Sequence, residues 1–318
     1  MFEVSVIIPN YNGYKYLPVC LNALRKQTIT NFEVILVDNG STDESIELIN
    51  RNYTEVKVIQ LDDNYGFCRA VNEGIKASCA PFVILLNNDT EVEENFIEEL
   101  LKAINRSERL FSCSAKMISY NDRTIMDGAG NLYCALGWAY ARGVGKPCDK
   151  YNKNRRIFAS CAGAAIYRKK IFDEIGLFDE EHFAYLEDID IGYRAKIHGY
   201  ENRYIASARV YHVGSGTTGS RYNKFKVKCT SRNSIYLVYK NMPLIQIIIN
   251  LPLLIPGFFI KFLFFLRLGF GLDYLFGIVN GFKLSFRNKK VKFKRINLRN
   301  YIKIQLELWA NVIRRISN

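Results

Sequence analysis

Three strand-like stretches in the first ninety residues each end in polar side chains that could bind a ligand. Asn87-Asn88-Asp89 follows the apolar run 82–86, Pro9-Asn10-Tyr11 follows the run 4–8, and Asp38 follows the run 34–37. In open parallel sheets, ligands bind outside the carboxyl ends of the strands. We therefore expect these three polar strand ends to form one site at one edge of one sheet.

A second group of acids lies between residues 179 and 190, where six carboxylates alternate with aromatic side chains. A helix that starts near Glu187 would pair Asp190 with Arg194 one turn later and leave Asp188 free in its first turn. A solvated acidic helix start would also explain this pattern. The neighbouring residues 183–186 are mostly apolar, however, and acids beside apolar surface are candidates for shifted pKa values.

His212 precedes a glycine-rich stretch, 214–219, that matches the pattern G-x-G-x-x-G. We reject a dinucleotide-binding motif, and with it a nicotinamide-dependent oxidoreductase, because no acid lies between Glu201 and Asp273. The stretch instead predicts a mobile loop, and His212 could be structural or functional. Cations that follow the loop would meet a diphosphate, namely Arg221, Lys224, Lys226, Lys228 and Arg232.

Strand and helix signals alternate through the first hundred residues, which predicts right-handed βαβ units and a mostly parallel sheet. The expected strands are 4–9, 32–38, 56–61 and 82–88, and the expected helices are 16–27, 43–51, 68–78 and 92–104. Capping boxes at 41–44 and 90–93 would mark two helix starts. Residues 109–165 predict short strands and loops, and the small-residue run 159–165 predicts close approach to another element or to a ligand, before a helix near Arg168.

Charge and apolar surface set the carboxyl-terminal third apart. Residues 221–318 hold 19 of the 44 Lys/Arg but only two of the 31 acids, a net charge of +17, whereas residues 1–220 carry −4. The apolar stretch 242–260 contains three prolines, which predicts broken helices that lie in a membrane interface beside anionic head groups. A spanning or re-entrant hairpin and an intramolecular or oligomer-forming core are the alternatives. So much aliphatic surface argues against nucleic acid as the partner.

Other sequence features suggest where the chain works. Eight scattered cysteines without a C-x-x-C pair indicate buried thiols in a reducing compartment. The amino terminus runs into a strand without a signal peptide, so we expect a cytoplasmic protein, peripheral on the inner face of the cell membrane. We expect a first domain at 1–235 and an apolar, basic helical region at 236–318 for membrane attachment or oligomerisation.

In combination, these motifs resemble the family 2 glycosyltransferases of GT-A fold, particularly the bacterial rhamnosyltransferase-like branch. The matching stretches run in family order over about 230 residues: 5–12, 37–43, 64–72, 85–89, Gly163-Ala164, 185–194, His212 with its glycine loop, and Arg232-Asn233. The resemblance implies a Rossmann-like, mixed and mostly parallel sheet flanked by helices. It also implies a membrane-associated carboxyl-terminal region.

The resemblance also assigns roles at the donor site. Asp38 would accept from the base of a uracil or thymine nucleotide, and the remaining nucleotide-binding residues would be Pro9, Asn10, Tyr11, Asn64, Gly66, Asn72 and Asn88. Asp89 would hold Mg²⁺ or Mn²⁺, with His212 completing that site. The family's Asp-x-Asp motif reads Asn87-Asn88-Asp89 here, so its first carboxylate is missing. A catalytically decayed transferase that acts as a membrane-bound binding protein is therefore the alternative.

The remaining implied roles concern the reaction itself. Asp188 would be the catalytic base of a single, inverting displacement. Residues at the acceptor side or behind the site would be Gly163, Ala164, Glu187, Asp190 and Trp138. The donor would be a dTDP- or UDP-sugar, with rhamnose favoured, and the acceptor a saccharide or lipid-linked saccharide of a bacterial surface polysaccharide. A homodimer is a further expectation.

Overall fold

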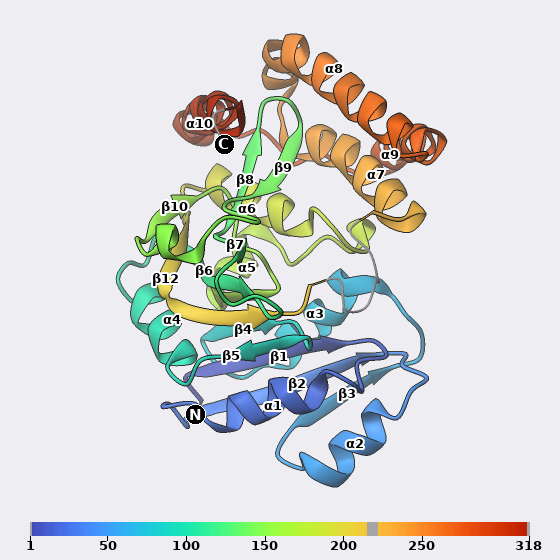
Figure 1. Cartoon of the computed structure of the whole chain (residues 1–318). Coiled ribbons are helices and arrows are strands. Elements are labelled where there is room, and N and C mark those ends of the chain that lie inside the picture. Colours follow the sequence, from blue (N-terminus) through green and yellow to red (C-terminus); the bar gives the residue numbers. More distant parts are fainter. Residues whose placement is uncertain (1, 215–221, 317–318) are drawn as a thin grey trace.

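The computed structural model describes residues 2–214 and 222–316, arranged around one large mixed sheet (Figure 1). The strand order is β10-β12-β6-β11-β4-β1-β2-β3, with β5 beside β12 and β7 beside β6. Its strands are β1 (Val4–Asn10), β2 (Phe32–Asn39), β3 (Lys57–Leu61), β4 (Phe82–Leu86), β5 (Thr90–Val92), β6 (Leu110–Ser119), β7 (Met126–Gly128), β10 (Arg155–Ile157), β11 (Ala164–Arg168) and β12 (Glu201–His212). The four strands from β3 to β4 are parallel, and antiparallel β11 joins them to the parallel pair β6–β12. The expected α/β fold is confirmed.

Helices cover both faces of this sheet because the central strands are apolar on both sides. The five residues of β4 are all buried, as expected for a parallel strand between two helical layers. The helices of this part are α1 (Leu17–Arg25), α2 (Ser45–Asn52), α3 (Gly66–Ala77), α4 (Phe96–Ile104), α5 (Phe172–Ile175) and α6 (Glu187–Ile197). One core lies under α1, α2 and α4, and the other lies under α3, α5 and α6.

Both expected capping boxes are wrong. Helix α2 begins at Ser45, after Glu44, and its first amide donates to Asp43 Oδ1 at 3.1 Å rather than to Ser41. The hydroxyl of Ser41 instead donates to Asp38 Oδ1 at 2.6 Å, so it closes a turn at the strand end. Thr90 begins strand β5 rather than a helix, and α4 starts only at Phe96. The Ser41 hydroxyl also accepts from the Asn12 amide at 2.9 Å, and Thr90 is paired with β12, so tertiary hydrogen bonds outweigh the local capping preference in both places.

Residues 109–165 form strands and loops, as expected, although β6 has ten residues and is not short. The helix expected near Arg168 begins one residue later, as the 3₁₀ turn Lys169–Ile171 that continues into α5. The small residues 164–165 belong to strand β11, which ends at Arg168, and the first α-helix after it begins at Phe172. A separate hairpin of β8 (Asn131–Cys134) and β9 (Trp138–Ala141) projects from the sheet toward the carboxyl-terminal helices (Figure 1). Short 3₁₀ turns are η1 (Cys148–Tyr151), η2 (Lys169–Ile171), η3 (Glu180–His182) and η4 (Arg295–Asn297).

The carboxyl-terminal helices are α7 (Lys224–Asn241), α8 (Leu244–Arg267), α9 (Gly271–Arg287) and α10 (Leu298–Ile316). A third core unites the hairpin with α6, α7, α8 and α10. The amide of Ala135 donates to Leu308 of α10, and Asn311 donates to the carbonyl of Tyr133. Helix α10 is therefore part of the folded body. The expected domain division after residue 235 lies inside α7, which takes part in both regions.

The expectation of broken apolar helices is wrong, because α8 is continuous through Pro252 and Pro256. Tertiary hydrogen bonds hold it on both sides of the prolines: Gln246 accepts from Tyr193, and the Gly257 carbonyl accepts from Trp138. Its 24 residues make it long and apolar enough to cross a membrane, by length and composition only. Most of its side chains lie outside the protein interior.

Candidate active site

A cavity of about 640 Å³ opens at the carboxyl ends of β1 and β4, where the sequence predicted a site. The lining residues come from strand ends, from the segment before α6, from the β8–β9 hairpin and from the first turns of α7. They include Pro9, Asn10, Tyr11, Asn64, Gly66, Asn88, Asp89, Gly163, Glu187, Asp188 and His212. Eleven of the sequence-predicted residues thus share one cavity.

Asp38 lies behind the cavity wall. Its strand is in parallel register with β1, which sets Asp38 opposite Asn10. The Asp38 carboxylate accepts from Asn10 Nδ2 at 2.9 Å and from the amide of Ser41 at 3.0 Å. Asn88 in turn donates to Asn10 Oδ1 at 2.7 Å. A Cβ on Gly13 would lie 2.1 Å from Asn10 Oδ1, so this polar chain requires glycine there.

Asn64 and Gly66 form the next part of the rim. Asn64 Oδ1 accepts from Asn39 at 2.9 Å and from the Gly66 amide at 3.0 Å, which fixes the turn into α3. Gly66 has a positive φ, and a Cβ there would lie 2.6 Å from the Phe183 ring. Asn72, by contrast, does not line the cavity. It donates to the Phe178 carbonyl at 2.8 Å and acts on the site only by packing α3 against the segment that leads to α6.

A carboxylate–imidazole–carboxylate row begins in the cavity lining with Asp89 and His212 and ends at Asp127 behind them. Strand β5 pairs with β12 and sets Thr90 opposite His212, which brings Asp89 to the same ring. His212 Nε2 lies 3.2 Å from Asp89 Oδ1, and Nδ1 lies 2.8 Å from Asp127 Oδ2. Burial alone would lower the pKa of His212, but hydrogen bonds to Asp127 and Asp89 raise it to about 10.

This row fits a divalent cation of the Mg²⁺ or Mn²⁺ type. Asp89 is 6% exposed and supplies hard carboxylate oxygens toward the cavity, and His212 Nε2 faces the same point. Histidine ligands in proteins usually donate their other ring nitrogen to a carboxylate, and Asp127 is in that position. Asn87 Nδ2 is 3.4 Å from His212 Nε2, so an amide takes the place of the family's first carboxylate.

Glu187 and Asp188 are the two carboxylates that the first turn of α6 contributes to the cavity lining. Asn131 of β8 donates to Asp188 Oδ2, and the Ile189 amide lies 2.7 Å from Asp188 Oδ1. Burial raises the pKa of Asp188 to about 6, although these hydrogen bonds oppose the rise. Burial and the Asp188 charge raise the pKa of Glu187 to about 8. Asp188 is therefore the more acidic of the two carboxyls and loses its proton first as the pH rises.

The segment that presents these acids is held in a strained conformation. Phe183, Tyr185 and Leu186 have φ between 60° and 71°, which is uncommon for residues other than glycine. Asn233 of α7 is fully buried and donates to the carbonyls of His182, Ala184 and Tyr185 at 2.7–2.9 Å. Because surrounding structure must over-determine such strain, the Asn233 clamp is what keeps the start of α6 in place.

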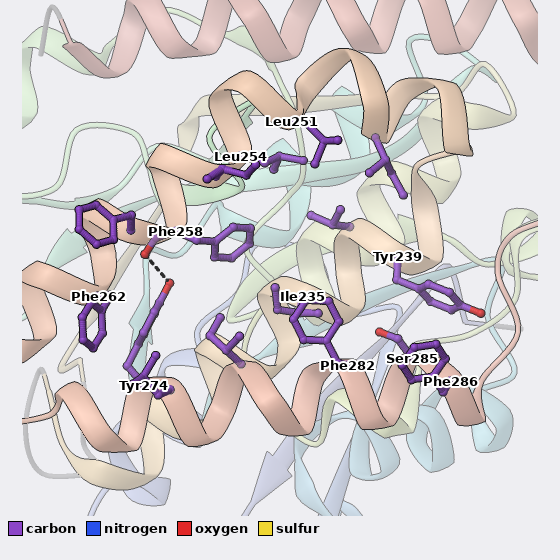
Figure 2. A pocket seen from close by; sticks show the side chains of 16 residues that line it. Ile235, Tyr239, Leu251, Leu254, Phe258, Phe262, Tyr274, Phe282, Ser285 and Phe286 are labelled. Atoms are coloured by element: carbon purple, nitrogen blue, oxygen red, sulfur yellow. Dashed lines mark hydrogen bonds between the residues drawn. The ribbon is translucent and has the colours of Figure 1, made fainter.

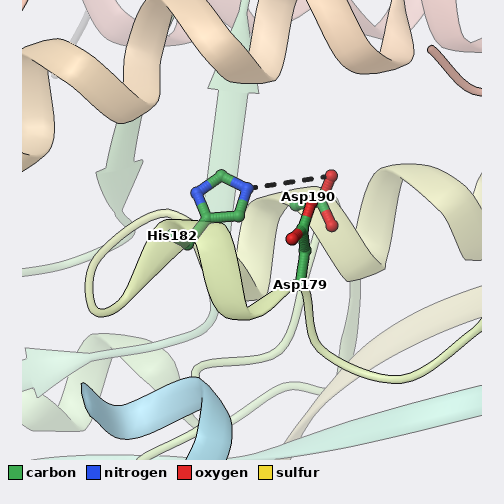
Figure 3. Close-up of side chains that lie close together, drawn as sticks. All are labelled: Asp179, His182 and Asp190. Carbon is green, nitrogen blue, oxygen red and sulfur yellow. Dashed lines mark ion pairs between the residues drawn. The ribbon is translucent and has the colours of Figure 1, made fainter. Parts of the chain in front are cut away.

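A second acidic group lies outside the cavity, beneath α7. Ligand atoms of Asp179, His182 and Asp190 come within 4.8 Å of one another, close enough to hold a metal ion (Figure 3). Lys240 Nζ, however, lies 2.6 Å from Asp179 and 2.9 Å from Asp190. Arg194 adds a hydrogen bond of 2.8 Å to Asp190, as the i,i+4 spacing predicted. The two cations balance the two carboxylates, so the group is already a neutral, buried ion-pair network.

Other predicted residues lie at or beyond the cavity edge. Ala164 is buried in β11, and Trp138 lies at the hairpin end, where Nε1 donates to the Gly257 carbonyl at 2.9 Å. Of the predicted diphosphate-binding cations, only Lys226 lines the cavity among the described residues. Lys228 pairs with Asp273, and Arg232 donates to the carbonyls of Glu181 and His182. Arg221 and most of the glycine loop lie outside the described residues.

Sequence reasoning missed three residues that the structure brings to the site, namely Asp127, Asn131 and Gly13. Asp127 and Asn131 lie in the glycine-rich region 126–145, whose strands were not assigned individually. The only feature of the sequence that could have marked Asp127 and Asn131 as site residues was that each is a polar residue within or beside a short apolar stretch. Gly13 follows a predicted strand end, but its role depends on a side-chain pair that local sequence does not reveal.

Comparison with known proteins identifies relatives of this chain. The model of glycosyl transferase family 2 matches residues 5–176. An N-acetylglucosaminyl-diphospho-decaprenol L-rhamnosyltransferase of Mycobacterium tuberculosis is 27% identical over 239 residues, which is 68% of this chain and 78% of that protein. Glycosyltransferase GlyG of Streptococcus pneumoniae is 32% identical over 133 residues, 41% of this chain and 42% of its own length.

Solved structures share the fold. GalNAc-T7, crystallised with UDP, GalNAc and Mn²⁺, superposes with a TM-score of 0.60 at 22% identity, over 75% of this chain and 48% of that one. TarS residues 1–349 of S. aureus superpose with a TM-score of 0.53 at 19% identity, over 95% of this chain and 78% of that one. These structures support the GT-A architecture expected from the sequence.

Proposed function

The chain belongs to glycosyl transferase family 2, and from this premise we propose that it is an inverting transferase that takes a sugar from a dTDP- or UDP-sugar donor. The observation that carries the proposal is that one cavity is lined both by Asp89, from the turn after β4, and by Asp188, from the first turn of α6. One carboxylate lies where a donor diphosphate and its cation would bind, and the other lies where an acceptor hydroxyl would enter.

The donor nucleotide would lie at the ends of β1 and β2. Asp38, Asn10 and Asn88 form a buried polar chain that suits the hydrogen-bonding edge of a pyrimidine base. Asn64 and Gly66 would close over the nucleoside, and Lys226 would meet the diphosphate from α7. The complexes of GalNAc-T7 and TarS with UDP support a nucleotide in this architecture. A rhamnose donor is favoured by the mycobacterial relative.

Asp188 would act as the base. Its carboxylate takes the proton of an acceptor hydroxyl as that oxygen forms a bond to the anomeric carbon of the donor sugar. The bond from this carbon to the diphosphate oxygen breaks on the opposite face, and the electron pair leaves with the nucleoside diphosphate. Asn131 orients the Asp188 carboxylate, and Asn233 fixes the segment that carries it.

Asp89 and His212 would hold Mg²⁺ or Mn²⁺, with Asp127 orienting the His212 ring. When bound, such an ion neutralises negative charge on the diphosphate. The chain's own contribution is that Asp89 and His212 already lie side by side, with the amide of Asn87 next to them. A cation would take the place of the proton through which His212 Nε2 is bonded to Asp89.

The acceptor would be a saccharide or lipid-linked saccharide at the inner face of the cell membrane. Helices α8 and α9 expose large apolar side chains; those more than half exposed include Leu244, Ile245, Ile255, Phe259, Leu272 and Phe286. A net charge of +17 over residues 221–318 would draw this surface to anionic head groups. The mycobacterial relative, named for a decaprenol-linked acceptor, supports the lipid-linked alternative.

Calorimetric titration with UDP and with dTDP, each with Mn²⁺ and with EDTA, tests the proposal. We expect metal-dependent binding that Asp89→Ala abolishes and that the exposed control Asp122→Ala retains. A sugar-nucleotide screen for transfer would follow. Nucleotide binding without any turnover would favour the decayed binding protein, to which the missing first carboxylate at Asn87 points. If the folded protein bound neither UDP nor dTDP, both the transferase hypothesis and the hypothesis of a decayed binding protein would be refuted.

A further inference from the structure

Helices α7, α8 and α9 enclose a second cavity, of about 750 Å³, which the transfer reaction does not use (Figure 2). We call it the helical groove. Its walls are aliphatic and aromatic, and they include Ile235, Leu251, Leu254, Phe258, Ile278 and Phe282. Its volume falls within the range of about 300–1,000 Å³ that is typical of small-molecule sites.

The groove offers almost nothing to a polar ligand. Its three hydroxyl groups already donate to backbone carbonyls: Tyr239 to Asn288, Tyr274 to Phe258 and Ser285 to Gly281. A peptide or sugar placed here would lose its own hydrogen bonds to water without replacement, which is unfavourable. A hydrocarbon chain has no such requirement.

The groove is elongated along α9. It runs beside α9 from Tyr274 to Phe286, a distance of about 18 Å at the helical rise of 1.5 Å per residue. Tyr274 and Phe262 lie at one end and Tyr239 and Phe286 at the other (Figure 2). Gly277 and Gly281 bring α9 against α7, since a Cβ at either would lie within 2.6 Å of α7 atoms. The floor is therefore closed, and one extended chain fits its length.

Positive charge is concentrated at one end. Lys290 Nζ lies 5.1 Å from the centre of the Tyr239 ring, which lines the groove, and Arg287 and Lys289 are exposed nearby in sequence. Between residues 244 and 298 there are nine Lys/Arg and one acid, Asp273. Two copies that met through this surface would bring like charges together, which disfavours a second chain as the occupant.

We propose that the helical groove binds one hydrocarbon chain of an anionic membrane lipid, with the head group at the Lys289 and Lys290 end. The inference goes beyond sugar transfer and beyond attachment at the membrane surface. The lipid would complete the apolar packing of α7, α8 and α9. Because α7 also contributes Phe225, Lys226 and Thr230 to the transfer cavity, a lipid in the groove would brace one of that cavity's walls.

The test uses the full chain and cis-parinaric acid, an anionic single-chain fluorophore, without vesicles or nucleotide. We expect saturable one-to-one binding that Ile278→Trp weakens at least tenfold by filling the groove. Leu251→Trp, at a lining residue 40% exposed, provides a second filling variant in case the first disturbs folding. The matched control is Leu272→Trp, an 84% exposed position of α9 outside the groove, which should bind the probe as wild type does.

A charge arm tests the position of the head group. The double variant Lys289→Gln/Lys290→Gln should bind cis-parinaric acid about tenfold more weakly than wild type does. It should bind the uncharged methyl ester of the same acid as tightly as wild type does. The proposal would be overturned if cis-parinaric acid did not bind saturably. It would also be overturned if Leu272→Trp lost as much affinity for this probe as Ile278→Trp and Leu251→Trp do. A stable dimer by sedimentation that Ile278→Trp dissociates would also overturn it, since a second copy would then cover the groove. No outcome depends on nucleotide binding, so the proposed transfer function is tested separately.

Discussion

His212 Nε2 lies 3.2 Å from Asp89 Oδ1, although the two residues come from β12 and from the turn after β4. Their approach follows from strand pairing, because β5 runs antiparallel to β12 and places Thr90 opposite His212. The amide of Val213 also donates to the Asp89 carbonyl at 3.1 Å, which ties the end of β12 to the same turn. A short strand of three residues thus decides whether these two side chains can act on one cation.

The first prediction concerns Asp127, which holds the other nitrogen of His212. Asp127→Asn should weaken Mn²⁺ binding about 10- to 100-fold, the usual effect of losing an outer partner of a histidine ligand. Electron paramagnetic resonance of free Mn²⁺ measures this directly. Asp122→Asn, at an exposed acid five residues earlier, is the control and should leave the affinity unchanged. Equal affinities for Asp127→Asn and wild type would remove Asp127 from the site.

The second prediction separates the two adjacent acids. Asp188→Asn should lower kcat about 100- to 10,000-fold, because the base can no longer accept a proton. Glu187→Gln should cost far less, because burial and the Asp188 charge raise the pKa of Glu187 to about 8, so that Glu187 keeps its proton to higher pH than Asp188 does. Single-turnover assays with the sugar nucleotide identified in the donor screen compare the two variants. If Glu187→Gln were the more damaging change, the base would have to be reassigned.

The third prediction is a pH dependence. The proposed base must be ionised, and its pKa is raised to about 6, so the rate should fall tenfold for each pH unit below about 6. An Asp with an ordinary pKa near 3.9 would keep its activity much further into acid. Asn131 donates to the charged form of Asp188 and thereby lowers this pKa. Asn131→Ala should move the acid limb of the kcat/KM profile to higher pH, and an unmoved limb would contradict the assignment.

The fold and most of the cavity were predictable because they depend on local patterns. Apolar runs such as 82–86 predict buried strands, and polar residues at their ends predict the sheet edge at which Asn10, Asn88 and Asp89 meet. The capping boxes failed for the opposite reason. The Ser41 hydroxyl is used by Asp38 and by the amide of Asn12 from the first strand end, and Thr90 pairs with β12. A capping bond and a single tertiary hydrogen bond are each worth about 1 kcal/mol, so several tertiary bonds together outweigh one cap.

Residues that act through distant partners were beyond sequence reasoning. Nothing beside Asn233 in the sequence indicates that its amide reaches carbonyls some fifty residues earlier. Pro252 and Pro256 predicted a broken helix, but Trp138 and Tyr193 bind α8 on either side of them and keep it continuous. Predicting either outcome requires the packing of α7 and α8 against the hairpin and α6.

The fourth prediction concerns the Asn233 clamp. Asn233→Ala leaves buried carbonyls without a donor, which should lower the free energy of unfolding by about 1–3 kcal/mol. It should also lower kcat more than it changes KM for the donor, because Asp188 moves while the nucleotide residues of β1 and β2 do not. Urea unfolding and steady-state kinetics give the two numbers. Ser234→Ala, which removes an ordinary hydrogen bond within α7, is the control and should leave kcat near wild type. A variant that is destabilised but keeps full kcat would make Asn233 purely structural.

The fifth prediction concerns the membrane. Deleting the last helices would be a poor test, because α10 supplies Leu308 and Tyr301 to the third core. Ile245→Glu is better, since this side chain on α8 is 67% exposed and its burial in lipid would contribute about 1.5–3 kcal/mol. We expect cosedimentation with phosphatidylglycerol vesicles to weaken about tenfold or more. Val19→Glu, on the exposed side of α1, is the control and should sediment as wild type does. If both variants bound vesicles equally well, the α8 face would not be the contact surface.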